Sequence, residues 1–323
     1  MTDNPPEQTG RTTYGERRRQ RIDELAAASV DDAPGVSMLA SAWRRLRRNP
    51  VFLIGLGITI AFVVLAIISP WIAPYDPAAD PLIDEVQRQT NPIPGPEPGH
   101  PLGGDARGRD LLSRLLVGSR QTLIVGVAAT LIGLIGGVTL GALAGALGGW
   151  ADSFVMRCVD VMLSIPSLLL AFSLAALAQK PSQWTVIIAI AVIQVPIFAR
   201  LLRGSMLAQR VSDHVLAARA LGVKPSAIVF RHMLPNAFGP VVVQATLVLA
   251  VAIIDAAALS FLGLGNPDDR KPEWGQMLGA AQEYINSHPH LAVYPAACII
   301  VVALGFTLMG ESLREALDPK SRR

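Results

Sequence analysis

Long uncharged apolar segments limit what this chain can fold into. The first runs from Val51 to Tyr75 without a single charged residue, and a second runs from Gln121 to Gly149. About 20 apolar residues are enough for a helix to cross a bilayer. The composition agrees, because 51% of the residues are hydrophobic and 16% are charged, whereas a soluble domain carries about 25% charged residues. We therefore expect an all-α polytopic membrane protein.

The apolar segments predict six transmembrane helices with both chain ends on the same side of the membrane. The expected spans are 51–75, 121–149, 157–177 with a kink at Pro166, 184–198, 238–264 and 291–309. In this topology 20 of the 28 Lys and Arg residues lie on one side: nine before Val51, Arg157, six from 200 to 231 and four after Gly310. An excess of basic residues marks the cytoplasmic side. The N- and C-termini are therefore expected in the cytoplasm.

The segments around the spans differ in character. Residues 1–36 have the polar composition of a disordered cytoplasmic tail. Residues 37–50 form an expected interfacial elbow helix, whose four arginines suit contact with anionic membrane lipid. Residues 76–120 are predicted as an extracytoplasmic Pro-rich loop and connector, because the many prolines exclude regular helix. The five later spans form an expected core at 121–313, followed by a short helix at Glu311–Leu317 and a cytoplasmic C-terminal tail at 314–323.

The second span carries glycines at a regular four-residue spacing: Gly133, Gly137, Gly141, Gly145 and Gly149. This spacing places all five on one helical face, where glycine lets the backbone of another helix approach closely. We expect this face to be a tightly packed helix interface.

The stretch from Ser212 to Asn236 is polar and lies between two apolar segments. It predicts a short helix, a sharp turn and a second short helix. Asp213 suits the positive end of the first helix, Gly222 can adopt the left-handed conformation after it, and Pro225 suits the first position of the second. Pro235 is expected to end that second helix.

Several residues of this stretch resemble the cytoplasmic loop signature of ABC importer permeases. The match rests on Ala217 and Ala218, Gly222 four residues later, and Leu234-Pro235 twelve and thirteen residues after Gly222. The family motif often has Glu where this chain has Leu216. In that family the loop is a coupling helix that docks in a groove of the ATPase subunit. The resemblance therefore implies ATPase contacts at Asp213, Leu216, Ala217, Ala218, Arg219, Gly222, Arg231, His232 and Pro235. The alternative is an ordinary cytoplasmic loop with two interfacial helices.

Asp255 lies inside the fifth expected span, and intramembrane carboxylates usually face protein or a water-filled path. The residues from Asp255 to Gly265 and from Pro272 to Leu278 resemble dipeptide-type permeases. Asp255, with Gln244 and Gln194 in the spans, is accordingly a candidate for the translocation path. Asp255 would equally serve as a packing residue that bonds to a neighbouring helix.

Some motifs are missing from the sequence. It contains no Gly-x-x-x-x-Gly-Lys-Ser/Thr phosphate loop, so ATP and Mg²⁺ are expected on partner ATPase subunits. No Cys/His cluster has the spacing of a zinc site, and no metal or other cofactor is expected on this chain. The resemblance to importer permeases accordingly implies a transporter subunit rather than an enzyme.

These features together resemble the C-type permease subunit of a dipeptide/oligopeptide ABC importer. The resemblance implies a type I ABC importer permease fold in a bacterial cytoplasmic (inner) membrane, working by alternating access. Its expected partners are a homologous B-type permease, ABC ATPase subunits, an extracytoplasmic peptide-binding protein, the peptide substrate and membrane lipid, but no nucleic acid. Two alternatives remain at this point: a nickel-type ABC permease and a self-sufficient secondary transporter.

Overall fold

The computed structural model describes residues 38–86 and 93–317. It divides at Arg44–Arg45 into two units. Most of the first unit lies outside the described residues, as do the expected tail at 1–36 and the last six residues of the segment 314–323. The first helix, α2 (Met38–Leu46), falls within the expected elbow at 37–50, and α3 begins at Pro50.

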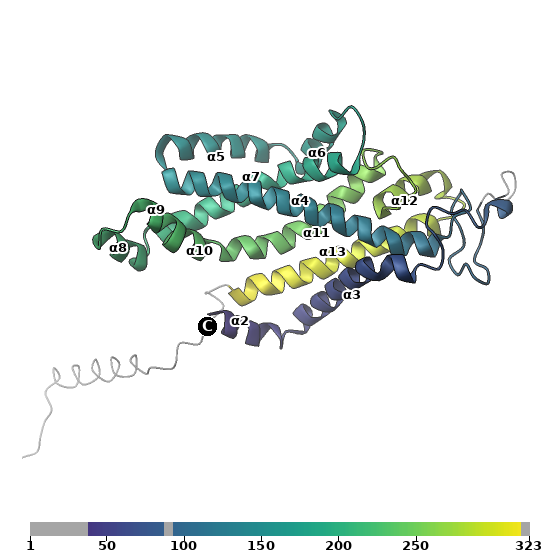
Figure 1. Cartoon of the computed structure of the whole chain (residues 1–323), viewed down its shortest axis with the longest axis horizontal. Helices are drawn as coiled ribbons and strands as arrows, with labels where there is room; N and C mark the ends of the chain where they lie inside the picture. The colour runs from purple at the N-terminus through teal and green to yellow at the C-terminus, as the bar shows by residue number, and fades with distance from the viewer. Residues whose placement is uncertain (1–37, 87–92, 318–323) are drawn as a thin grey trace, which may run out of the picture. The chain divides into compact units, whose positions relative to one another are not determined.

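The described part of the second unit is helical, which confirms the all-α expectation. Five of its helices are long and apolar enough to cross a membrane: α3 (Pro50–Ile72), α4 (Leu111–Leu147), α7 (Gln183–Arg210), α11 (Gly239–Phe261) and α13 (His290–Leu317). A sixth candidate is the pair α5 (Gly149–Ser164) and α6 (Ser167–Ala176), which is bent by 93°. Figure 1 shows α4, α7, α11, α13 and α3 running side by side along the long direction of this unit.

Short elements connect these helices. On the segment between α3 and α4 the structure has η1 (Ile83–Glu85). Between α7 and α11 it has α8 (Asp213–Ala220), α9 (Pro225–Ala227), the π-helix η2 (Ile228–Met233) and α10 (Leu234–Ala237). Between α11 and α13 it has α12 (Trp274–Ala281) and η3 (Gln282–Tyr284).

The third expected span is wrong as a single kinked helix over 157–177. The chain leaves α4 through Gly148, turns, and starts α5 already at Gly149. Pro166 then separates α5 from α6 instead of kinking one helix. The residue before a proline is pushed out of the helical region, and Ile165 is indeed extended, with φ −92° and ψ 133°.

Two other boundaries differ from expectation. Helix α4 starts at Leu111, ten residues before the predicted Gln121, because the side chain of Asp110 caps it by accepting a 2.7 Å hydrogen bond from the Ser113 N–H. The short helix predicted at Glu311–Leu317 is not separate, since α13 continues through it without a break.

The glycine face of α4 packs against α7. A Cβ atom added to Gly133 would lie 2.8 Å from Gln194 Cβ, and one added to Gly141 would lie 2.6 Å from the Ala199 carbonyl oxygen. Both distances are too short for real contacts, so larger residues would force the two helices apart. Gly149 does not belong to this face, because α4 ends at Leu147 and Gly149 has a φ of +57° in the turn to α5.

Small residues also join α6 to the bundle. Ala171 and Ala175 of α6 are buried together with Ile187 of α7 and with Ala252 and Ala256 of α11. Helix α6 therefore covers the first third of α7, while α5 lies along its later part through the ion pairs Asp160–Arg200 and Asp152–Arg203.

Candidate functional site

Helix α8 ends in a tight left-handed turn at one end of the bundle. The Gly222 N–H donates to the Arg219 carbonyl oxygen at 3.0 Å, and the Val223 N–H donates to the Ala218 carbonyl oxygen at 3.1 Å. This pair of bonds is the Schellman motif, which needs a residue at positive φ after the helix. Gly222 supplies it with a φ of +74°. A Cβ atom at this position would meet no other atom within 4 Å, so the constraint on Gly222 is conformational rather than steric.

The second half of the loop differs from the prediction at its end. Pro225 does occupy the first turn of a helix, but Pro235 does not stop it. Helical structure continues through η2 into α10 and reaches Ala237. A proline ring in a regular α-helix would clash with the carbonyl group four residues earlier. The wider π-turn just before Pro235, closed by a bond from the Leu234 N–H to the Val229 carbonyl oxygen, removes that clash and so lets the helix continue.

The loop is anchored by one face and exposed on the other. Val215 and Ala218 are buried with Met206 of α7 and Met233 of η2. Ala218 therefore faces the core, whereas Ala217 beside it is exposed. On the outer side Leu221 is 84% exposed and Phe230 is 69% exposed.

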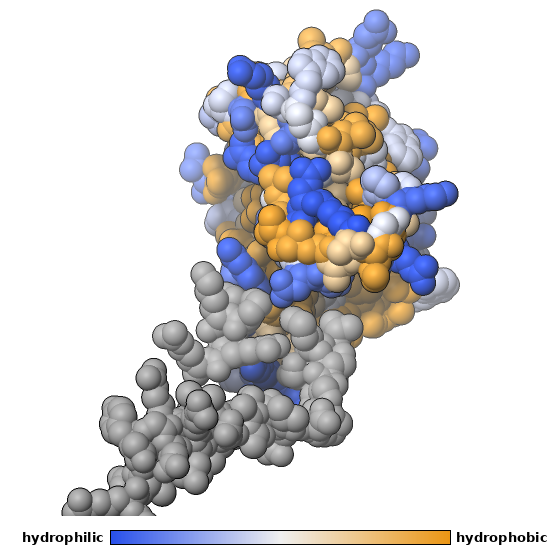
Figure 2. Space-filling view, turned by 90° about the vertical axis from the view of Figure 1, so that its left-hand side faces the viewer, coloured by the Kyte–Doolittle hydropathy of each residue, from blue (hydrophilic) through white to orange (hydrophobic). Residues whose placement is uncertain are grey.

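The exposed side of the loop mixes apolar and charged side chains. Of the residues predicted to contact an ATPase, Ala218 is buried and His232 is half-buried, while the others are exposed: Asp213, Leu216, Ala217, Arg219, Gly222, Arg231 and Pro235. Figure 2 views the end of the unit that carries α8 and α9, where apolar and hydrophilic side chains alternate on the surface. Exposed large apolar side chains of this kind are typical of a surface that contacts another protein or a membrane.

The three polar residues predicted for the translocation path occupy different environments. Gln194 is 3% exposed and lies in the interface between α7 and α4, against Gly133. Asp255 and Gln244 are half-buried on α11. Eleven residues are about three helical turns, so Asp255 and Gln244 share one stripe of that helix. Exposed Val251 and Leu262 lie on the same stripe. Asp255 and Gln244 therefore point toward the open side of α11, and Gln194 does not.

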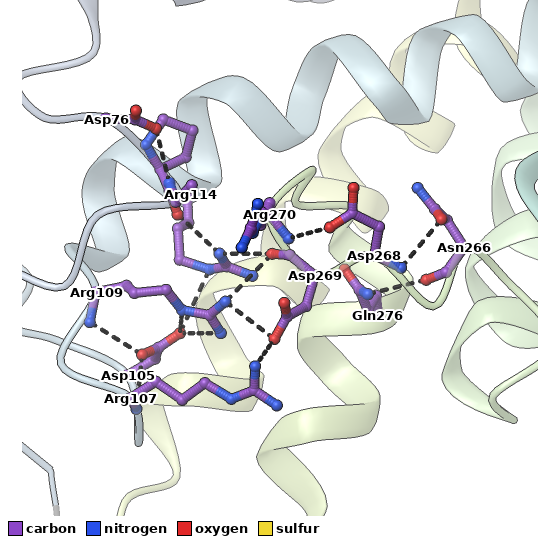
Figure 3. Close-up of polar contacts among 12 residues, drawn as sticks. Asp76, Asp105, Arg107, Arg109, Arg114, Asn266, Asp268, Asp269, Arg270 and Gln276 are labelled. Carbon is purple, nitrogen blue, oxygen red and sulfur yellow. Dashed lines mark hydrogen bonds and ion pairs between the residues drawn. The ribbon is translucent and has the colours of Figure 1, made fainter.

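A cluster of charges at the opposite end of the bundle was not predicted. Arg109 and Arg114, at the start of α4, meet Asp105 and the loop residue Asp269 (Figure 3). The Arg109 guanidinium lies 2.7 Å from Asp105 Oδ2 and 3.1 Å from Asp269 Oδ2. Arg114 donates to the carbonyl oxygens of Asp269 at 3.0 Å and of Pro77 at 2.9 Å. Arg107 also pairs with Asp269.

This outer cluster, defined as Asp105, Arg107, Arg109, Arg114 and Asp269, joins segments about 160 positions apart. The side chain of Arg114 is 4% exposed, and a buried charge is stable only when it is paired and hydrogen-bonded. The cluster also borders a cavity of about 850 Å³ that reaches the end of α11 and helix α12. The sequence places Arg109 and Arg114 close to leucines at a helix start, but no spacing rule links either arginine to Asp269.

Glu273 is a second buried charge-bearing residue near this end. It is 5% exposed, and its Oε1 accepts a 3.0 Å hydrogen bond from the Ser260 hydroxyl. Burial raises the pKa of Glu273 from 4.5 to about 7, although the Ser260 bond lowers it. The neighbouring Trp274 is buried and donates from Nε1 to the Leu115 carbonyl oxygen at 2.9 Å. The segment 273–274 therefore fixes the outer loop against α4.

Within the described ranges, 38–86 and 93–317, no group of three or more His, Cys, Asp or Glu residues is placed to hold a metal ion. His288 and His290 lie next to each other with ring centroids 5.8 Å apart.

Two family models match the sequence. Residues 137–323 match the model described as binding-protein-dependent transport system inner membrane component. Residues 37–92 match the model described as N-terminal TM domain of oligopeptide transport permease C.

Curated relatives align along most of the chain. The dipeptide transport system permease protein of Alkalihalophilus pseudofirmus is 40% identical over 295 residues, covering 90% of this chain and 93% of the relative. The di/tripeptide transport system permease protein of Pseudomonas aeruginosa is 40% identical, with coverage of 88% and 93%. The glutathione transport system permease protein of Pectobacterium atrosepticum is 38% identical, with coverage of 86% and 90%.

Solved structures share the fold at lower identity. A chain of the inward-facing MetNI methionine ABC transporter matches with a TM-score of 0.51 and 21% identity, covering 64% of this chain and 96% of that one. A chain from an amino acid ABC transporter with histidines matches with a TM-score of 0.50 and 17% identity, covering 61% and 91%.

Proposed function

The chain belongs to the family of binding-protein-dependent transport system inner membrane components, and from this premise we propose that it carries short peptides inward as the C-type permease of an ATP-driven importer. It is a multi-pass inner-membrane permease subunit with the fold of ABC importer permeases. It is not itself an enzyme, because in this family ATP is bound by the partner ATPase. A self-sufficient secondary transporter is therefore set aside.

The observation that carries the importer proposal is the exposed face of the loop at Asp213–Ala237. Its helices are too short to be stable alone in water, yet they present Leu216, Leu221 and Phe230 to the outside. An apolar helix face of this kind fits a groove on a partner protein. We assign that groove to the ATPase subunit, with Arg219 and Arg231 at its edges. ATP-driven closure of the ATPase pair would then move α8 and, through Val215 and Ala218, the ends of α7 and α4.

The substrate class rests on the relatives. Those named above are permeases for dipeptides, di/tripeptides and glutathione, and glutathione is itself a short peptide. The nickel-type alternative has no support from these relatives. The short peptide arrives from an extracytoplasmic binding protein and passes between this chain and a homologous B-type permease. A dipeptide is the substrate we favour within this class.

For the passage itself we assign Asp255 and Gln244, which lie on the open stripe of α11. A carboxylate there offers an acceptor to the peptide's amino group. Gln194 has a different role in this proposal: it fills the space beside Gly133 and holds α7 against α4. Gly133, Gly137, Gly141 and Gly145 serve the same interface.

The substrate assignment is tested with the complete complex, containing both permeases, the ATPase subunits and the binding protein, in proteoliposomes. Uptake of a labelled dipeptide, of glutathione and of Ni²⁺ is measured with and without ATP. We expect ATP-dependent uptake of the dipeptide, with weaker or no uptake of glutathione and none of Ni²⁺. Uptake of Ni²⁺ without peptide uptake would overturn the proposal.

The role of Asp255 is tested by Asp255→Asn, with Asp80→Asn on the exposed segment after α3 as the matched control. We expect Asp255→Asn to reduce peptide uptake at least tenfold while the yield of intact complex stays the same. Normal uptake with a reduced yield of complex would instead assign Asp255 to helix packing.

A further inference from the structure

The residues of the break between α5 and α6 are all exposed on the surface of the chain. Every residue from Leu163 to Leu169 is exposed. The backbone turns by 93° here, and Ile165 and Pro166 are both extended, with ψ values of 133° and 127°. The chain thus presents irregular backbone, rather than helix, at this point of its surface.

Backbone donors at the start of α6 have no acceptor within the helix. The first N–H groups of any α-helix lack an intrahelical partner, which here applies to Ser167, Leu168 and Leu169. Pro166, at the capping position, makes no side-chain hydrogen bond to them. The first bond of the helix is the one from the Leu170 N–H to the Pro166 carbonyl oxygen at 3.0 Å. These donors need water or another protein.

The break lies deep along the neighbouring span. Before it, Asp160 of α5 pairs with Arg200 of α7, and after it, Ala171 of α6 is buried in the same hydrophobic cluster as Ile187 of α7. The break therefore lies beside the part of α7 between Ile187 and Arg200. At about 1.5 Å per residue these two positions are roughly 6 Å and 25 Å from the start of α7, which puts the break inside the thickness of the membrane. Exposed irregular backbone does not occur against lipid at this depth.

Charges on the same face support this conclusion. The side chains of Asp160 and Arg200 are 62% and 54% exposed although they pair with each other. Arg157, one turn before Asp160, is exposed too. The charge count placed Arg157 and Arg200 at the cytoplasmic ends of their spans, and charged side chains that enter a span face the protein interior or a water-filled cavity rather than lipid. The face that runs from Arg157 past the Asp160–Arg200 pair to the break is therefore not a lipid-facing surface.

We propose that this face, formed by Arg157, Asp160, Ser164 and the α5–α6 break together with Arg200, is a wall of the aqueous passage through which the peptide moves. The inference rests on the function proposed above and extends it to residues outside the path predicted from the sequence. Helix α11 continues this wall, because Ala252 and Ala256 pack on α6 and Asp255 lies between them and the open side of α11. With Asp255 included, the wall holds two arginines, Arg157 and Arg200, and two aspartates, so its charges balance beside the exposed apolar side chains of the break. Such a wall suits a zwitterionic peptide, whose two termini are hydrated as it passes but not held by an excess of one charge.

Cysteine accessibility in the assembled complex tests this wall without requiring transport. In a background with Cys158→Ser and Cys298→Ser, single variants Ser164→Cys and Asp160→Cys are compared with Ile60→Cys, which lies on the exposed apolar face of α3. Inside-out vesicles are treated with a charged, membrane-impermeant methanethiosulfonate and with an apolar maleimide, in the resting state and with ATP and vanadate. We expect the charged reagent to modify Ser164→Cys and Asp160→Cys in at least one state, at least tenfold faster than Ile60→Cys.

Two results would overturn the proposal. Modification of Ser164→Cys by the apolar maleimide alone, as at Ile60→Cys, would make this a lipid-facing surface. Protection from both reagents in both states would make it a contact buried by the partner permease. Peptide uptake is measured separately. If the charged reagent labels these cysteines in a complex that takes up no peptide, the proposal of an aqueous wall holds and the proposed substrate is rejected.

Discussion

The two ends of the helical bundle depart from the usual burial pattern in opposite ways. At the outer end, the charges of Arg109 and Arg114 are buried, and the chain itself supplies their partners, Asp105 and Asp269. At the cytoplasmic end, the apolar side chains of Leu221 and Phe230 are exposed, and no part of the described chain covers them. The chain itself supplies the partners of the buried charges at the outer end, whereas at the cytoplasmic end we expect a second protein to cover the apolar side chains.

This difference predicts whether a substitution at each end changes the stability of the fold or the strength of an interface. A buried charge that loses its partner destabilises the fold itself, since the desolvated group has no alternative. An exposed apolar side chain contributes little to the isolated fold but much to an interface. We therefore expect outer-end variants to change the stability of the complex and loop variants to change ATPase recruitment and coupling.

The largest effect is expected for Arg114→Met. It leaves the Pro77 carbonyl group without this donor and takes one of two arginine donors from the Asp269 carbonyl group, whose other donor is Arg109. Breaking a buried pair costs about 3–5 kcal/mol. The control is Arg107→Met, which removes a pair whose arginine side chain is 67% exposed and should cost at most about 1 kcal/mol. Thermal unfolding of the purified complex measures both. Equal losses in the two variants would remove the distinction between the buried and the exposed parts of the cluster.

The next effect is a pH dependence at Glu273. Its raised pKa means that the folded protein holds this proton up to about pH 7, whereas an exposed carboxyl loses it near 4.5. The contribution of Glu273 to the free energy of unfolding is therefore fully present below about pH 4.5 and is lost as the pH rises to 7. The change is on the order of 3 kcal/mol. Glu273→Gln cannot ionise, so we expect it to flatten the dependence of the unfolding midpoint on pH between 5 and 8. The exposed residue Glu283 provides the control variant Glu283→Gln, which should keep the wild-type slope, and an equally steep slope in Glu273→Gln would contradict the prediction.

Much of the architecture followed from local sequence, because spans and turns depend on neighbouring residues. The uncharged runs located the long helices, and Gly222 and Pro225 predicted the turn of the loop. The glycine spacing indicated a packed face on α4, although not that α7 is its partner. In each case the relevant physics acts within a few helical turns.

Interactions between distant segments could not be predicted in this way. Gln194 was a candidate path residue because it is polar in a span, whereas its burial against Gly133 depends on how α4 and α7 pack. The three-residue spacing of Arg157 and Asp160 would allow a local ion pair, whereas Asp160 pairs with Arg200 on another helix. The outer cluster was missed for the same reason, since Asp269 is far from Arg109 in sequence. Pro166 shows a further limit: a proline predicts a disturbance, but not whether the helix bends or ends.

A smaller effect on stability is expected at Gly222, where the turn of the loop depends on a positive φ. Gly222→Val would force a β-branched residue into this conformation at a cost of about 1–2 kcal/mol. Gly222→Asn is the matched control, because asparagine tolerates the left-handed region and open space surrounds the position. We expect the valine variant to insert normally but to bind less ATPase and to hydrolyse ATP without peptide uptake, while the asparagine variant works. Equal behaviour of the two variants would show that the conformation of this turn does not control coupling.

The smallest effect on stability, and the sharpest test of the comparison, is expected for Leu221→Ser. The side chain is 84% exposed, so its replacement should change the unfolding free energy of the chain by no more than about 0.5 kcal/mol. If the ATPase covers Leu221, however, the same change removes apolar contact area from that interface, and truncation of a central interface residue costs about 2 kcal/mol or more. We expect the ATPase to be recovered with the permease in at least tenfold lower yield at limiting concentration, with unchanged unfolding of the permease pair. Leu177→Ser, which alters an equally exposed leucine after α6, serves as the control and should leave ATPase recovery normal. Normal recovery with Leu221→Ser would mean that the exposed face of the loop is not the surface that the ATPase covers.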